Sequence, residues 1–598
     1  MSVAAAASKA EGMGAIPLEE GVAFRVWAPH ADAVAVVGEF NDWDPARDEL
    51  DAEDGGYWYG YSADARPGHK YQFRIRNGED EFNRIDPYAR EVTNSVGDGV
   101  IYRDEFDWEG DAFEAAPLNE LVIYEMHIGV FNRGDDEDRP GTFDQAIERL
   151  GHLKQLGVNA LEIMPAAEFA GDISWGYNPA HIFAVEGAYG GPDALKRFVK
   201  EAHRAGLAVI LDVVYNHFGP SDLSLWRFDG WSENDKGGIY FYNDWKSETP
   251  WGDTRPDYGR AEVRQYVRDN ALMWLEEFHI DGLRMDMTLF MRSVDGGNAD
   301  LPEGRSLIQW INSEVRERFP HKLTIAEDLR DDAWLTQPAE MGGGGFSAQW
   351  HARFVHPVRE SIEVVQDEWR SMEDVKNALL GRFNGDPFER VIYSESHDET
   401  ANGRQRPVSE IDGENPHSPH SMKRAALGAG LVLTAPGIPM LFNGQEFAED
   451  GWFDDNEPLD WSKAERYSGM VQLYSDLVHL RLNRNGETRG LTGSNIDVYR
   501  VDEEAKVVAF HRWYDGGPKD SVVVVANFAN SYYESFDVGM PAEGVWKLLF
   551  NSNWKGYGDQ MDGQAAADVE ARCGERDGMN AYATLSLPSY GLLIYSRS

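Results

Sequence analysis

Short runs of alternating hydrophobic and polar residues fill the first ~115 positions of the chain. Val22–Trp27 alternates, Ala33–Val37 is a brief apolar run, and Asn41–Pro45 and Pro67–Gly68 are turn sequences. Alternation with a period of two places successive side chains on opposite faces of a strand. Short strands at this spacing predict a β-sandwich over residues 15–115, preceded by a flexible N-terminus over residues 1–14.

From about Leu121 the pattern changes, because short apolar runs now alternate with longer amphipathic stretches. The candidate strands are Leu121–Met126, Val158–Met164, Leu207–Val213, Ile280–Asp286, Leu323–Glu327, Val391–Ser396 and Ile438–Phe442. Strand and helix in alternation predict a parallel sheet closed into a (β/α)8 TIM barrel over residues 116–485. An insert over residues 218–259 is too long for a simple βα loop, and we expect it to overhang the active-site face.

Residues 486–598 return to strand patterns, as in Val507–His511 and Val522–Phe528. They predict a C-terminal all-β domain, a second β-sandwich. The chain is therefore predicted to be a multidomain α/β protein with a central barrel between two β domains.

The composition limits the choice of partner. The 598 residues include 103 Asp and Glu against 56 Lys and Arg, which gives a formal net charge of −47. Such a surface repels phosphate backbones and anionic headgroups, so nucleic acid and membranes are excluded as expected partners, whereas neutral substrates stay open. Adaptation to a salty cytoplasm and ordinary solubility both explain the acidity.

The single cysteine, Cys573, excludes an intrachain disulfide and fits a reducing compartment. The start of the chain has no basic region followed by a long apolar core, and no apolar stretch approaches the ~18 residues of a membrane span. These features predict a cytoplasmic protein.

Four segments place polar residues directly after an apolar run that reads as a strand. They are Asp212–His217, Gly282–Asp286, Ile325–Asp328 and Ser396–Glu399. In a (β/α)8 barrel this position is the C-terminal rim, where active sites lie. Asp286, Glu327 and Asp398 thus stand at three strand ends and are candidates to meet in one cavity. Any one of them alone would more often be a salt-bridge partner.

In order and character, the four segments resemble those of the α-amylase family, glycoside hydrolase family 13. The flanking sequence agrees, because Phe24–Pro29 and Val37–Trp43 resemble the family 48 carbohydrate-binding module, and Arg84–Ala89 resembles its end. The resemblance implies a barrel enzyme that acts on an α-1,4-glucan or a maltooligosaccharide.

The resemblance also implies catalytic roles. Asp286 matches the nucleophile of the family, Glu327 the general acid and base, and Asp398 a carboxylate that holds sugar hydroxyls. A retaining mechanism needs the first two carboxyl groups about 5 Å apart. Arg284, two residues before Asp286 on the same face of a strand, is expected to keep Asp286 ionised.

Further positions match the sugar-binding residues of the family. His217 and His397 match histidines that hydrogen-bond the sugar, Tyr177 matches an aromatic platform, and Asp212 matches a structural aspartate. Asn216 matches a calcium ligand of many α-amylases, but one oxygen ligand is not a calcium site. We expect no required metal and no cofactor.

Sequence features point to two subgroups of the family. Asn216–Pro220 resembles maltooligosyltrehalose trehalohydrolases, whereas Ser396–Glu399 and Gly444–Phe447 resemble 1,4-α-glucan branching enzymes, and Met287–Phe290 departs from both. The expected activity is cleavage of an α-1,4 bond and transfer of the chain to a 6-hydroxyl. Hydrolysis, as an α-amylase or a trehalohydrolase, is the alternative, and a non-catalytic glycan-binding protein is a remote one.

The aromatic residues of the insert have two interpretations, stacking on glucose rings or packing the insert against the barrel. They are Trp226, Trp231, Tyr240, Tyr242, Trp245 and Trp251.

Overall fold

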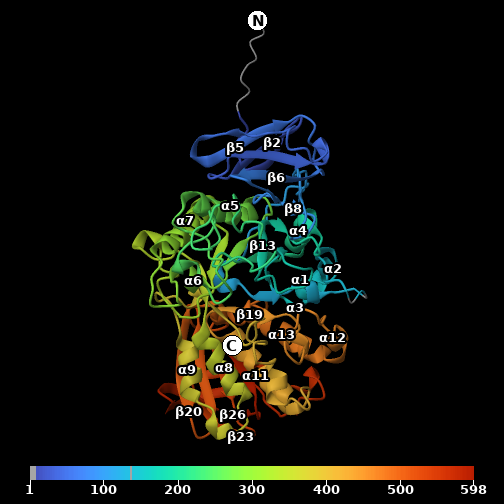
Figure 1. The fold of residues 1–598 in the computed structure, drawn as a ribbon. Helices are drawn as coiled ribbons and strands as arrows, with labels where there is room; N and C mark the ends of the chain where they lie inside the picture. Colours follow the sequence, from blue (N-terminus) through green and yellow to red (C-terminus); the bar gives the residue numbers. More distant parts are fainter. Residues whose placement is uncertain (1–8, 135, 137, 598) are drawn as a thin grey trace.

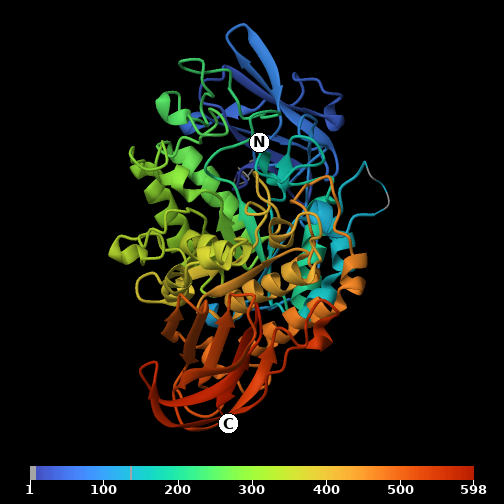
Figure 2. The ribbon, with the colours of Figure 1, turned by 90° about the horizontal axis from the view of Figure 1, so that it is seen from below.

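The computed structural model describes residues 9–134, 136 and 138–597, which form three regions in chain order (Figure 1). A blue β region lies at one end, the green and yellow barrel follows, and an orange-red β region closes the other end. Figure 2 gives a second view of this arrangement. No helix among the described residues is both long and apolar enough to cross a membrane.

The N-terminal region consists of two antiparallel sheets, as predicted. One has the order β1-β2-β5-β4, with bounds Gly14–Pro17, Val22–Trp27, Tyr57–Ser62 and Asp51–Ala52. The other has the order β3-β6-β9-β8, with bounds Ala33–Gly38, Lys70–Asn77, Gly99–Val100 and Glu91–Val92, and β7 (Asp80–Arg84) pairs with β6. Because successive side chains of β6 alternate between its two faces, Tyr71, Phe73 and Ile75 are buried, whereas the residues between them are only partly buried.

The predicted flexible N-terminus, residues 1–14, is partly outside the described residues, which begin at residue 9. Its described part lies on the sandwich: Arg25 donates hydrogen bonds of 2.8 Å to the carbonyl oxygens of both Ala10 and Gly12. Lys9 pairs with Glu53 at 2.8 Å. Arg25 therefore holds residues 10–12 on the sandwich through their main-chain oxygens.

Eight parallel strands close into the central barrel. They are β10 (Ile123–Met126), β11 (Ala160–Ile163), β14 (Ala208–Val213), β15 (Gly282–Met285), β16 (Leu323–Ala326), β17 (Ala348–Trp350), β18 (Arg390–Ile392) and β19 (Ile438–Phe442). Seven overlap the predicted strands. The eighth, β17, was not predicted, because Gln349 stands at its centre and no longer apolar run surrounds it.

Helices surround the barrel, and α4 shows how the sequence forms them. It spans Gly191–Ala205, with Pro192 in its first turn and Gly206 at its C-cap in the left-handed region (φ 85°), a conformation that glycine adopts without strain. Leu195, Phe198 and Ala202 face the barrel and are fully buried. The other long helices are α5 (Ala261–Glu276), α7 (Pro302–Arg318), α8 (Ala352–Glu363), α11 (Pro419–Thr434) and α13 (Ser468–Arg481).

The C-terminal region forms one eight-stranded antiparallel sheet with the order β20-β21-β22-β27-β24-β25-β26-β23. The strands are β20 (Asn495–Asp502), β21 (Val507–Trp513), β22 (Val522–Asn527), β23 (Tyr533–Met540), β24 (Gly544–Asn551), β25 (Val569–Arg576), β26 (Met579–Leu587) and β27 (Leu592–Arg597). Val523, Trp546 and Leu585 share its core. Buried Arg512 fastens it to the barrel, since the guanidinium donates to the carbonyl oxygens of Thr434 and Leu491.

Among the described residues of the insert, 218–259, the one helical element is the short 3-10 turn η4 (Trp245–Ser247). Much of the insert packs on the N-terminal sandwich: Trp231 stacks on His30 at 4.6 Å, and His30 Nδ1 lies 2.9 Å from Asp229. Its last turn returns to the barrel rim. The insert thus connects the sandwich to the rim.

Candidate active site

The four rim segments meet at the C-terminal end of the barrel. Asp212 lies in β14 and Arg284 in β15, and the two residues are paired in the register of these neighbouring strands. Asp286 and Glu327 each follow the last residue of their strand, β15 and β16. Parallel strands end at one rim, so the fold brings these side chains together.

Buried Arg284 is at the centre of this group. Its Nη1 lies 2.5 Å from Asp212 Oδ2 and 3.3 Å from Asp286 Oδ1, and its Nη2 lies 2.9 Å from Glu327 Oε2. The Trp350 ring covers the guanidinium at 4.3 Å. One cation therefore faces three carboxyl groups.

The Asp286 carboxyl is buried and fixed in place. Asn216 Nδ2 donates to its Oδ2 at 2.7 Å and to its main-chain oxygen at 2.9 Å. Burial raises the pKa of Asp286 to about 6, against the opposing charge of Arg284 and the hydrogen bonds from Asn216 and Glu327. At neutral pH this carboxylate is ionised.

The Glu327 carboxyl holds its proton more tightly than an ordinary glutamate. Burial raises its pKa, Arg284 lowers it, and the negative charge of Asp286 raises it. The Met287 N–H donates to its Oε2 at 2.9 Å. Met287 has φ 37°, in the left-handed region that non-glycine residues rarely adopt, and this strained backbone precedes helix α6 (Thr288–Arg292).

Tyr177 and two histidines lie beside this group of charged residues. The Tyr177 hydroxyl donates to Asp212 Oδ2 at 2.6 Å, and the Tyr177 carbonyl oxygen lies 2.9 Å from His217 Nε2. The His397 ring stacks on Tyr177 at 5.1 Å. Burial lowers the pKa of each histidine to about 4, so both imidazoles are neutral at pH 7. Neutral imidazoles suit hydrogen bonding to sugar hydroxyls.

Asp398 is the most exposed of the three predicted catalytic carboxyl groups, being only half-buried. It follows β18, next to His397, and accepts a hydrogen bond of 2.6 Å from Asn402 Nδ2. Burial raises its pKa, whereas nearby His397 lowers it. All eight predicted site residues therefore lie at one end of the barrel.

The sequence analysis missed two buried glutamates beneath this group. Glu125 in β10 and Glu162 in β11 are register partners, and burial raises the pKa of each to about 8. Glu125 Oε1 lies 2.5 Å from His397 Nδ1 and its Oε2 accepts from the His397 N–H at 3.1 Å, so Glu125 fixes the orientation of that ring. A glutamate within an otherwise apolar strand run was the available signal.

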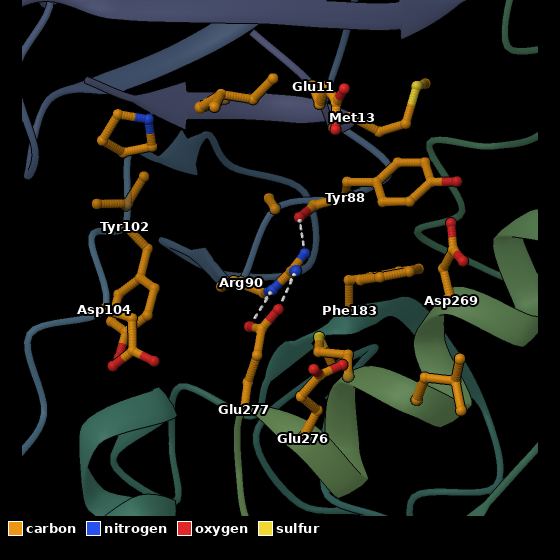
Figure 3. Close-up of a pocket in the computed structure, with 18 of the residues that line it drawn as sticks. Glu11, Met13, Tyr88, Arg90, Tyr102, Asp104, Phe183, Asp269, Glu276 and Glu277 are labelled. Carbon is orange, nitrogen blue, oxygen red and sulfur yellow. Dashed lines mark hydrogen bonds and ion pairs between the residues drawn. The ribbon is translucent and has the colours of Figure 1, made fainter. Parts of the chain in front are cut away.

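A separate pocket of about 620 Å³ lies at the seam between the sandwich and the barrel (Figure 3). At its centre Arg90 donates to both Glu277 oxygens, at 2.7 and 3.0 Å, and to the Tyr88 carbonyl oxygen at 2.9 Å. Arg268 and Arg318, which also line it, are ion-paired as well. None of the eight predicted site residues lines this pocket, whose lining mixes charged residues with apolar ones such as Met13 and Phe183.

Family models match all three regions of the chain. The carbohydrate-binding module 48 (isoamylase N-terminal domain) matches residues 12–89, and the α-amylase C-terminal all-beta domain matches residues 499–598. The α-amylase catalytic domain matches residues 93–245 and 220–476, more than half of the chain.

Similar proteins agree with these matches. A 1,4-alpha-glucan branching enzyme GlgB of Salinibacter ruber is 30% identical and covers 98% of this chain and 96% of its own length. One from Photobacterium profundum is 31% identical over 90% of this chain and 77% of its own length. Pullulanase type I from Bacillus subtilis, complexed with maltose, shares the fold with a TM-score of 0.77 at 21% identity, covering 98% of this chain and 86% of that one.

Proposed function

Because the chain belongs to the α-amylase family, we propose that its barrel site cleaves an α-1,4-glucosidic bond and transfers the released chain to a 6-hydroxyl of a second glucan. This is the activity of a 1,4-α-glucan branching enzyme. The observation that carries the proposal is the pairing of Asp286 and Glu327 across buried Arg284. The chain is also 30% identical, over 98% of its length, to a protein named as a branching enzyme.

In the first step, an Asp286 carboxylate oxygen attacks C1 of the donor sugar. The bond between C1 and the leaving O4 breaks, and Glu327 gives its proton to that oxygen. The ionised state of Asp286 and the raised pKa of Glu327 suit these two roles. The glycosidic oxygen has to come within reach of both carboxyl groups for this step.

In the second step, the Glu327 carboxylate accepts the proton of the acceptor 6-hydroxyl. The acceptor O6 then attacks C1 and Asp286 leaves, which restores both side chains. Water in place of the acceptor gives hydrolysis with the same residues. His217, His397, Tyr177 and Asp398 hold the sugar at the cleaved bond, and the proposal involves no metal or cofactor. It includes a reducing, cytoplasmic setting, which the single cysteine allows.

Hydrolysis of a trehalose-ended maltooligosaccharide is the second candidate, because Asn216–Pro220 resembles trehalohydrolases. Asn216 and His217 lie within the site, and His217 Nδ1 is 2.6 Å from Asn216 Oδ1. This segment therefore lies where it can influence the choice of substrate.

Incubation with amylose separates branching from hydrolysis of a plain glucan, and incubation with maltooligosyltrehalose tests the second candidate. Branching predicts falling iodine colour and growing α-1,6 anomeric proton signals while reducing ends stay nearly constant. Hydrolysis predicts a matching rise of reducing ends without α-1,6 signal, and this outcome would refute the proposal. Asp286→Asn is the control, since it removes the nucleophile and is expected to abolish every change.

A further inference from the structure

The structure separates the six aromatic residues of the insert into two groups. Tyr240 and Tyr242 are buried, and Trp226 and Trp231 pack against the hydrophobic core. Trp245 and Trp251 are exposed, by 57% and 37%. Trp251 alone of the six has a ring contact with a predicted site residue, among the described parts of the chain.

Trp251 lies against the wall of the active site. Its ring stacks on His217 with centroids 4.5 Å apart and an interplanar angle of 13°. On another side it meets Phe290 edge to face at 5.4 Å. The exposed part of the indole is therefore held beside the catalytic group.

The turn that carries Trp251 is fastened at several points. The Thr249 hydroxyl accepts from the Trp251 N–H at 3.2 Å and donates to the Gly252 carbonyl oxygen at 2.8 Å. Buried Arg255 donates to the carbonyl oxygens of Glu248 and Val294 at 2.8 Å each, which joins the turn to the segment after α6. These bonds preorganise the indole, so a ligand that stacks on it pays little ordering entropy.

Phe290 links this indole to the end of β16, which Glu327 follows. Phe290 belongs to α6, whose first residue, Thr288, donates through its N–H to the Glu327 carbonyl oxygen at 2.7 Å. The leaving group departs on the side of the acid that protonates it, and an acceptor enters the same space. Trp251 thus lies between His217 of the sugar site and helix α6, which contacts the main chain of Glu327.

We infer that Trp251, backed by Phe290, is the stacking platform for the acceptor glucan and thereby determines how often the covalent intermediate is transferred rather than hydrolysed. The inference rests on the proposed function, because an acceptor glucan is part of the reaction only if the protein is a transferase. Burial of the apolar face of a glucose ring against an indole is favourable in free energy, whereas a water molecule has no apolar face to bury. The platform therefore favours sugar over water at the same intermediate.

The test compares Trp251→Ala and Trp251→Phe with Trp245→Ala, a matched change of an exposed tryptophan in the same insert. With amylose as donor, we measure α-1,6 linkages formed per reducing end released. Loss of one buried aromatic contact predicts that Trp251→Ala lowers this ratio about tenfold or more. Trp251→Phe is expected to restore most of the ratio, and Trp245→Ala to leave it unchanged.

A binding measurement keeps this inference separate from the proposed function. In the Asp286→Asn background, calorimetry with maltoheptaose is expected to show affinity weakened about tenfold by Trp251→Ala and unchanged by Trp245→Ala. If the wild type only hydrolyses amylose, branching is wrong, and the affinity loss still supports a sugar platform at Trp251. Unchanged ratio and unchanged affinity in Trp251→Ala would overturn the inference, as would an equal loss in Trp245→Ala.

Discussion

Asp212 and Arg284 form a 2.5 Å ion pair between neighbouring strands of the barrel, where both side chains are buried. Removing two charges from water is costly, and the cost is offset only when the geometry is good and further hydrogen bonds complete the group. Here the Tyr177 hydroxyl supplies another bond to the same Asp212 oxygen. Arg284 also forms ion pairs with Asp286 at 3.3 Å and with Glu327 at 2.9 Å, so the three carboxyl groups share one guanidinium.

Asp212→Asn is therefore expected to destabilise the protein. The substitution weakens the shortest contact of buried Arg284 but leaves Asp286 and Glu327 beside the guanidinium, so we expect a cost of about 1–3 kcal/mol, below that of a fully broken buried pair. The measurement is the free energy of unfolding from urea titration. Asp398→Asn is the matched control, because Asp398 is half-buried and its described hydrogen bond is to Asn402, and we expect lost activity with little lost stability. Equal unfolding free energies for the two variants would contradict this account.

The pH profile of kcat/KM is expected to be bell-shaped. The acidic limb follows Asp286, which must be ionised and whose pKa is about 6, and the alkaline limb follows Glu327, which must carry a proton. The two carboxyl groups interact, so the two limbs belong to the pair. Asn216→Ala removes a hydrogen bond that lowers the pKa of Asp286, so the acidic limb is expected to move to higher pH. An acidic limb that stays in place would show that Asp286 does not determine it.

Stability is expected to depend on pH through His203, which fastens the segment before the barrel. His203 Nδ1 lies 2.8 Å from Asp111 and its Nε2 lies 2.9 Å from Asp281. Burial alone would lower the pKa of His203, but the bonds and charges of Asp281 and Asp111 raise it above 6.5. A raised pKa contributes stability fully below the unfolded value, and this contribution is lost as pH rises through the folded value.

The free energy of unfolding is therefore compared at pH 6 and pH 9. The difference in this free energy between wild type and His203→Gln is expected to be larger at pH 6 than at pH 9. The reason is that only the protonated ring is stabilised by the charges of both aspartates. His321→Gln, a change of a side chain that is 65% exposed, is the control and is expected to show no such difference. A His203 effect that is the same at both pH values would contradict the role of its charge.

The sequence predicted the rim motifs well, because each places polar residues after an apolar strand that the barrel topology aligns. It did not show β17, since Gln349 interrupts Ala348–Trp350 and no longer apolar run surrounds this strand. Nor did it show the role of Glu125, whose contact with His397 joins strands that are distant in sequence. The stacking of Trp251 on His217 depends on how the insert returns from the sandwich, and no local pattern records such a path. The periodicity of hydrophobic residues predicts helices and strands, whereas these contacts arise from tertiary packing.

The negative net charge predicts that the stability of the protein depends on salt. A formal net charge of −47 destabilises the compact state by self-repulsion. The Debye length falls from about 10 Å at 0.1 M to about 3 Å at 1 M salt, so molar KCl screens repulsion between surface carboxylates. The urea midpoint of unfolding is therefore expected to rise with KCl. Buried Arg284 and its carboxylates are shielded from the salt, so the stability difference between wild type and Asp212→Asn is expected to stay the same. An unchanged midpoint would mean that the acidic surface serves solubility alone.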